Sequence, residues 1–418
     1  MEQRRTADLT TVTTTEFASD AIELLARTVR QAFRRTGAAI GTEHLLSTLL
    51  DDVEEPGEAL VPGGIRQTGS IGGEIRARGQ EHWARDDSGH PAQADGSEAR
   101  DGAHAPDDAI EVDAAWRETL WVAGSATKAL REEGTEPPRP TGALRETLFG
   151  ALRLAREEGS PDAHARHLAR ALLLETPESR ALEALALRRL DLTAAAGTLD
   201  AQAESVRAGG DPWPTEAAAV IGSVKLLRTA GLLGERGVWW SRRMLSWMSR
   251  GTGDGSPVML VLYNEAQRQA VRHGRTAPEP VDLLLAVVSL DRGLTVAGLS
   301  LPDELLAVNS AADELRSAGV RQTDLVRAAA AAAAAAEPSA LSAVPSDLER
   351  SPETNRTQAA ARLLAAERKA DTVGTAHMLA VLLDDPEGPP AQLLRETGAD
   401  PVALRTRIDA SLGSAHAA

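Results

Sequence analysis

Histidine spacing is the first feature of this sequence that could support chemistry. His164 and His167 stand three residues apart, which suits zinc, but the pair lacks the third histidine that would make a metal site convincing. The chain has no cysteine, no Gly-x-Ser-x-Gly elbow and no His-Glu-x-x-His motif. We therefore expect no metal, no cofactor and no catalytic centre, and we interpret the chain as a protein that is not an enzyme.

The elements that position these residues are predicted to be helices. Leu, Ala, Arg and Glu dominate, β-branched runs are scarce, and apolar residues recur at three- and four-residue spacing. Aromatic residues make up only 3% of the chain, so Leu, Ala and Val must fill the cores. The predicted fold class is all-α, without a convincing strand.

Net charge and composition narrow the class of partner. A formal charge of −16 argues against a dedicated nucleic-acid binder, which needs a concentrated basic surface. No apolar run approaches the ~18–20 residues of a membrane span, and the absence of cysteine fits a reducing compartment. We expect a cytoplasmic protein.

Internal repeats organise the chain. Residues 40–46 read Ile-Gly-Thr-Glu-His-Leu-Leu, and residues 373–379 read Val-Gly-Thr-Ala-His-Met-Leu. Each copy follows one predicted helix, opens a second and continues into a double Asp. Two degenerate copies, 163–168 and 278–284, lie between them. Four helix–turn–helix units are therefore predicted.

A second feature supports this register. Counting back 26 residues from His167, Asp282 and His377 gives residues that can cap a helix N-terminus; they are Thr141, Ser256 and Ser351. The same count from His44 gives Ala18, with Ser19 beside it as the expected cap. We expect His44 and His377 to be structural residues near the turn. The predicted segments are a first repeat (1–83), a disordered linker (84–108), a second repeat with an extra preceding helix (109–208), a third repeat with an extra Trp/Arg-rich segment (209–336), a linker (337–350) and a fourth repeat (351–418).

The repeated motif resembles the N-terminal Clp repeat (Clp R) domain of the Clp/Hsp100 unfoldases, especially ClpC. In that family two repeats pack into one all-helical domain that receives adaptors, substrates and cyclic peptide antibiotics. The unfoldase ATPase is not evident, because the sequence contains no Gly-x-x-x-x-Gly-Lys-Ser/Thr loop. How the four units pair, and in what oligomeric state, stays open.

The resemblance also implies which residues bind ligands. Some members bind phosphoarginine through a Glu of the motif and a Thr at the cap of the first helix. Here the Glu survives only as Glu43, and the cap hydroxyl survives only in other units, so no single unit holds both halves. The ligand- or partner-binding residues implied are Phe17, Ser19, Thr42, Glu43, Thr141, Ser351 and Thr375.

A basic aromatic segment, residues 236–250, stands apart from the repeats. It holds three of the seven tryptophans and four arginines without an acid. It could be a helix packed on its own domain, a partner-docking helix or a membrane-surface helix. Its candidate contact residues are Trp239, Trp240, Arg243, Met244 and Trp247.

Two functions remain open at this stage. The first is an adaptor or decoy that captures substrates, adaptors or peptide ligands of the ClpC unfoldase and that could sequester cyclic peptide antibiotics. The second is a regulatory scaffold that uses the basic aromatic segment on a membrane surface, a nucleic acid or a protein partner.

Overall fold

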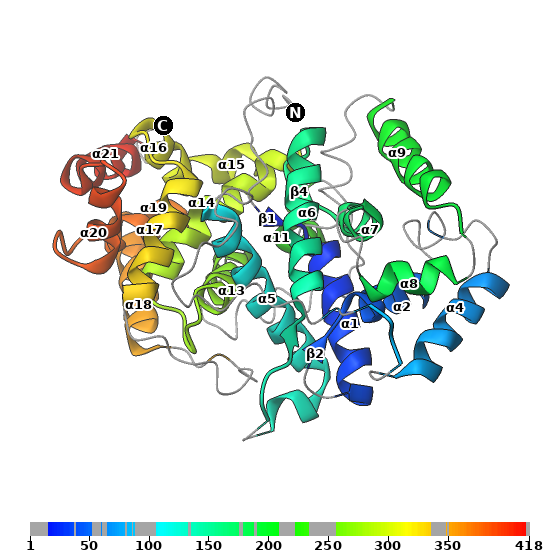
Figure 1. Cartoon of the computed structure of the whole chain (residues 1–418). Helices are drawn as coiled ribbons and strands as arrows, with labels where there is room; N and C mark the ends of the chain where they lie inside the picture. The colour runs from blue at the N-terminus through cyan, green and yellow to red at the C-terminus, as the bar shows by residue number, and fades with distance from the viewer. Residues whose placement is uncertain are drawn as a thin grey trace. The chain divides into compact units, whose positions relative to one another are not determined.

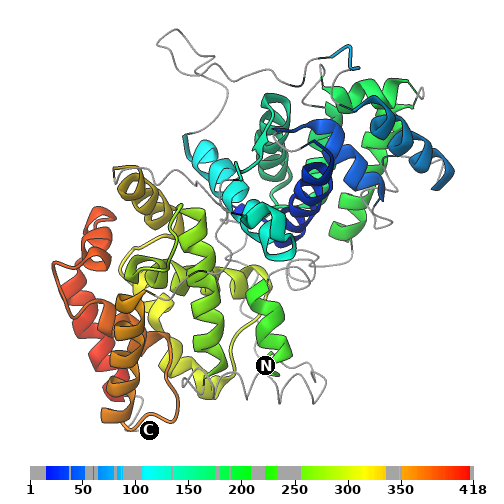
Figure 2. The same cartoon turned by 90° about the horizontal axis from the view of Figure 1, so that it is seen from below.

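The chain forms two compact helical units, each with its own buried core. The computed structural model describes residues 16–36, 39–51, 60, 65–79, 82–85, 87, 106–132, 135–174, 179–187, 190–208, 222–233, 256–335, 348 and 351–414. The described residues up to 208 form the N-terminal half, and those from 222 onward form the C-terminal half. Figures 1 and 2 show both halves in two orientations.

The N-terminal half contains the first two repeats. Its elements are β1 (Glu16–Phe17), α1 (Ser19–Thr36), β2 (Ala39–Ile40), α2 (Thr42–Asp51), α4 (Ile65–Arg78), α5 (Pro106–Ala126), the 3-10 helix η2 (Lys128–Arg131), β3 (Arg139–Pro140), α6 (Gly142–Glu158), β4 (Asp162–Ala163), α7 (Ala165–Leu174), α8 (Arg180–Ala186) and α9 (Leu192–Ala208).

The C-terminal half contains the last two repeats. Its elements are α11 (Gly222–Thr229), α13 (Pro257–Arg272), α14 (Pro280–Val296), α15 (Asp303–Leu306), the 3-10 helix η3 (Ala307–Asn309), α16 (Ala311–Ser317), α17 (Gln322–Ala335), α18 (Pro352–Glu367), α19 (Thr375–Leu382), α20 (Pro389–Glu396) and α21 (Pro401–Ser414). The predicted all-α class is confirmed. Among the described residues, no helix is long and apolar enough to cross a bilayer.

Each repeat packs its first helix along its second. The pairs are α1 with α2, α6 with α7, α13 with α14, and α18 with α19. The apolar pairs at the fourth and fifth positions of the second helices are buried, as Leu45 and Leu46 illustrate in α2. Burying one such side chain contributes roughly 1.5–3 kcal/mol. The apolar residues that recur at three- and four-residue spacing are therefore the residues that form the two cores.

The expected helix caps are only partly correct. Thr141 and Ser351 are N-caps, and their hydroxyls accept from the N–H groups of Leu144 (3.2 Å) and Thr354 (3.0 Å). Ser256 occupies the N-cap position of α13, but its side chain makes no cap hydrogen bond. Ser19 is not a cap, because α1 already begins there and the Ala18 carbonyl accepts the first helical hydrogen bond.

The expectation of no strands is wrong, although the strands are very short. β1 pairs in parallel with β4, and β2 pairs in parallel with β3. In each pair, the residues before the first helix of one repeat meet the residues before the second helix of the other. The two repeats of the N-terminal half are thus joined by two equivalent crossed contacts, which no local sequence pattern encodes.

The expected linker and extra helices also need correction. Residues 84–108 were predicted to be disordered, yet Asp87 is fully buried and α5 already begins at Pro106. The extra helix expected before the second repeat, within residues 109–208, is α5, which starts at Pro106 and packs along α1. Before the third repeat, the structure describes the short helix α11, from Gly222. Residues 88–105 and 337–347 of the two predicted linkers lie outside the described part of the chain.

Candidate functional site

The four second helices begin with the same hydrogen bond. In every repeat, the side chain of the third residue of the second helix accepts a hydrogen bond from the backbone N–H of the residue just before that helix. The donor–acceptor pairs are Gly41 N to His44 Nδ1 (3.0 Å), His164 N to His167 Nδ1 (2.8 Å), Glu279 N to Asp282 Oδ2 (2.9 Å) and Gly374 N to His377 Nδ1 (3.2 Å). The motif histidines, expected to be structural, are helix caps.

A second capping contact comes from elsewhere in the chain. At three of these helices, a side-chain oxygen accepts from the N–H of the first helical residue. The pairs are Thr42 N to Asp87 Oδ2 (2.7 Å), Ala165 N to Asp20 Oδ2 (3.0 Å) and Thr375 N to Asn309 Oδ1 (3.0 Å). The fourth helix, α14, starts with Pro280, which has no N–H to satisfy. These contacts tie segments distant in the chain to the repeated motif.

Asp87 has the fullest set of donors among these capping residues. Its carboxylate accepts four hydrogen bonds: from Thr42 N (2.7 Å), Thr42 Oγ1 (2.7 Å), Thr141 Oγ1 (3.0 Å) and Arg180 N (3.0 Å). Each hydroxyl in turn accepts from a backbone N–H, Thr42 from Ala181 and Thr141 from Leu144. Both hydroxyl protons are therefore committed to Asp87. We call the site formed by these four donors the carboxylate cradle. The Asp87 carboxylate occupies it.

Glu43 lies beside the carboxylate cradle and is only 2% exposed. Its Oε1 accepts a hydrogen bond from the Arg180 guanidinium (3.0 Å), whereas its Oε2 has no hydrogen-bond partner among the described residues. Burial and the negative charge of Asp87 raise the pKa of Glu43 to about 7, against the opposing effect of Arg180. Glu43 is thus an incompletely satisfied acid at the edge of the cradle.

Gly41 makes this arrangement possible. A Cβ at position 41 would overlap both Glu43 Oε2 and Asp87 Oδ2. The two carboxyl groups therefore share the face of the backbone that the missing side chain leaves open. Gly374 has the equivalent role in the fourth repeat, where a Cβ would overlap the backbone carbonyl of Val308.

The structure brings together three residues that the sequence assigned to different units. Thr42 and Glu43 of the first repeat meet Thr141 of the second around Asp87. The two halves of the predicted binding motif, absent from any single unit, thus lie at one place across the repeat pair. Asp87 and Arg180 were missed, since neither belongs to a repeated motif.

The remaining predicted residues lie elsewhere. Phe17 is a core residue, 2% exposed, whose N–H donates to Glu111 of α5 (3.0 Å). Ser19 lies in the first turn of α1, next to Asp20, which contacts the start of α7. Ser351 caps α18. The residues of the basic aromatic segment, Trp239, Trp240, Arg243, Met244 and Trp247, lie outside the described residues.

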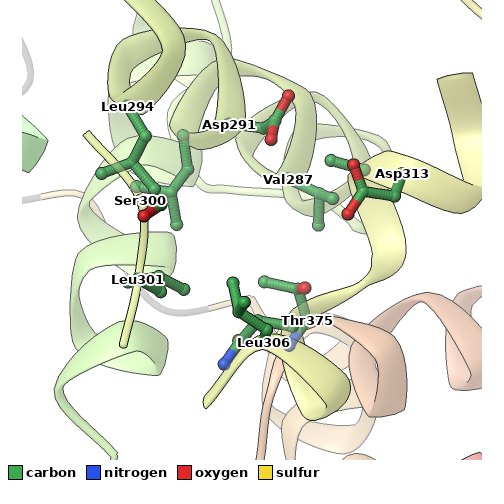
Figure 3. Close-up of a pocket in the computed structure, with 11 residues that line it drawn as sticks. Val287, Asp291, Leu294, Ser300, Leu301, Leu306, Asp313 and Thr375 are labelled. Carbon is green, nitrogen blue, oxygen red and sulfur yellow. Dashed lines mark hydrogen bonds between the residues drawn. The ribbon is translucent and has the colours of Figure 1, made fainter. Parts of the chain in front are cut away.

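Thr375 lines a small pocket of the C-terminal half. Figure 3 shows Thr375 and Leu306 on one side of this pocket and Asp291 and Asp313 on the other. Both carboxylates form ion pairs with Arg316, so each already has a cationic partner. The pocket is partly open to solvent, and its cavity volume is about 40 Å³, which is room for only a few water molecules.

Each histidine of the pair contacts a carboxylate. His167 Nε2 lies 2.6 Å from Glu158 Oε2, and His164 Nδ1 lies 3.2 Å from Asp20 Oδ1. Burial lowers the pKa of His167 to about 4, despite the hydrogen bond to Glu158. A neutral ring suits its two roles, since Nδ1 accepts from His164 and Nε2 can donate to Glu158. The described residues contain no group of three or more potential metal ligands.

Comparison with known proteins supports the class that the fold defines, an all-helical repeat protein. Residues 349–417 match the family model of the Clp repeat (R) N-terminal domain. The matched segment is the fourth repeat, from the cap of α18 through α21. No curated protein matches the chain. The resemblance to the Clp repeat family is therefore supported over this segment, and it implies interaction with protein partners.

Proposed function

We propose that the chain is a non-enzymatic binding protein of a Clp-type system, an adaptor or decoy that captures substrates, adaptors or peptide ligands of a ClpC-type unfoldase. The observation that carries the proposal is the match of the fourth repeat to the Clp repeat family. The cap shared by all four second helices supports treating the other three units as repeats of the same kind. Cyclic peptide antibiotics are among the ligands proposed.

Burial limits where a ligand can bind in the present conformation. Phe17, Thr42, Glu43 and Thr375 are each less than 5% exposed, so a partner cannot reach them without displacing neighbouring residues. The surfaces that remain open are the outer faces of the helices. Leu363 on α18 is 62% exposed and Val402 on α21 is 59% exposed, and both lie in the segment that matches the family.

The direct test is capture of partners by the full-length chain. The immobilised protein should retain a ClpC-type unfoldase, or its adaptors and substrates, from lysate. Added in excess, the protein should inhibit degradation by the corresponding protease. The matched control carries Leu363→Ser and Val402→Ser, which should preserve folding and weaken retention. Absence of both retention and inhibition by the folded wild type would refute the proposal.

A further inference from the structure

The carboxylate cradle has the composition of a binding site that is already occupied. Its four donors converge on one carboxylate that is fully buried. The donors belong to the starts of α2 and α6 and to Arg180, whereas the carboxylate comes from the segment between α4 and α5. Asp87 is separated from Thr42 by 45 residues and from Arg180 by 93 residues. The occupant and the site are thus independent parts of the chain.

The unsatisfied oxygen of Glu43 indicates that this occupant does not complete the site. Within the described part of the chain, Glu43 Oε2 is buried without a donor, and it lies against the same face of Gly41 as Asp87 Oδ2. A buried carboxylate oxygen without a donor is costly. An aspartate side chain has no N–H of its own to offer it. A ligand with a carboxylate and a nearby N–H could fill the cradle and satisfy Glu43 as well.

We propose that the cradle is a binding site for a polypeptide carboxylate, and that Asp87 is an intramolecular occupant that keeps it closed. The preferred ligand is a terminal carboxylate, because the amide N–H of the last residue lies beside it. The claim that a protein partner supplies this carboxylate rests on the function proposed above. The claim that the cradle binds a carboxylate rests only on the contacts of Asp87.

The test removes the occupant and supplies small probes. Asp87→Ala is titrated calorimetrically with sodium acetate, N-acetylglycine and inorganic phosphate, each against a sodium chloride blank. Acetate should bind with a dissociation constant of the order of millimolar, as expected for so few atoms. N-acetylglycine should bind at least about threefold more tightly through its N–H, and wild type should bind neither probe. Failure of both carboxylates to bind folded Asp87→Ala, or equal binding to wild type, would overturn the proposal.

Two further variants test whether the cradle differs from an ordinary helix N-terminus in binding acetate. Asp20→Ala removes the equivalent cap of α7, where no hydroxyl cradle surrounds the carboxylate, and it should not bind acetate. Adding Thr42→Val to Asp87→Ala should abolish binding. Equal acetate binding by Asp20→Ala, or phosphate binding more tightly than both carboxylates, would contradict the assignment.

The experiment remains decisive if Asp87→Ala fails to fold in chloride. Acetate should then restore the helical circular dichroism spectrum in a saturable manner, while chloride at equal ionic strength should not. No recovery in acetate would overturn the proposal. Because these measurements need no Clp partner, their failure is distinguishable from failure of the proposed function.

Discussion

At the scale of single residues, Glu43 is held where its charge is disfavoured. The Arg180 guanidinium offsets part of the cost of burial, but Asp87 adds a second negative charge, and no described residue donates to Oε2. The sequence singled out Glu43 from its position in the repeated motif. Its environment could not be predicted, since Arg180 lies 137 residues away and Asp87 belongs to a segment predicted to be disordered.

Replacing Glu43 with glutamine should change how stability depends on pH. The pKa of Glu43 rises from 4.5 to about 7 on folding, so the folded state holds this proton more tightly than the unfolded state. Wild type therefore loses stability as pH rises from about 4.5 to 7, by at most about 3 kcal/mol. Glu43→Gln lacks this loss, and its stability relative to wild type should increase from pH 5 to pH 8.

Urea unfolding of both proteins at four pH values measures this difference. Asp282 in the C-terminal half also has a pKa raised to about 7, but it is present in both proteins and cancels. A stability difference that stays constant across the pH range would contradict the environment described for Glu43.

Gly374 offers a test of close packing in the fourth repeat. A methyl group there would overlap the Val308 carbonyl, and a backbone atom cannot rotate away. We expect Gly374→Ala to destabilise the protein by about 1–3 kcal/mol. The matched control is Gly413→Ala in α21, where the nearest atom is a guanidinium nitrogen 3.8 Å away and alanine favours the helix. Equal thermal stability of the two variants would show that Val308 does not lie against Gly374.

At the scale of elements, the helices and their register could be predicted because their signals are local. Thr141 and Ser351 cap the helices they precede, and the motif histidines lie at the third position of the second helices. The contacts that cross between segments could not be predicted in this way. Asp87 and Asn309 cap helices that begin 45 and 66 residues away in the chain.

The shared cap predicts a specific rank among variants of His44. His44→Ala removes both the ring and the acceptor for the Gly41 N–H. His44→Asn also removes the ring but keeps an oxygen acceptor, as Asp282 does in the third repeat. We expect the asparagine variant to be more stable than the alanine variant by about 1 kcal/mol. Chemical denaturation measures this difference, and equal stability would mean that the hydrogen bond contributes nothing.

At the scale of the whole molecule, repeats pair in chain order, the first with the second and the third with the fourth. The sequence left this open, because all four repeats carry similar apolar faces. The first repeat is completed by crossed contacts from the second. Ile40 accepts from the Thr141 N–H, and Thr42 accepts from the Ala181 N–H. The repeat pair, rather than the single repeat, is the unit that satisfies its buried polar groups.

Dividing the chain tests this conclusion. Fragments 1–213 and 214–418 each retain one complete core, so each should show a helical circular dichroism spectrum and unfold cooperatively. Fragment 1–100 contains the first repeat and Asp87 but lacks Thr141, Arg180 and the strand partners β3 and β4. It leaves Leu45, Leu46 and the α2 start uncovered, and it should therefore remain largely unfolded. A cooperatively folded 1–100, or an unfolded 1–213, would contradict the repeat pair as the folding unit.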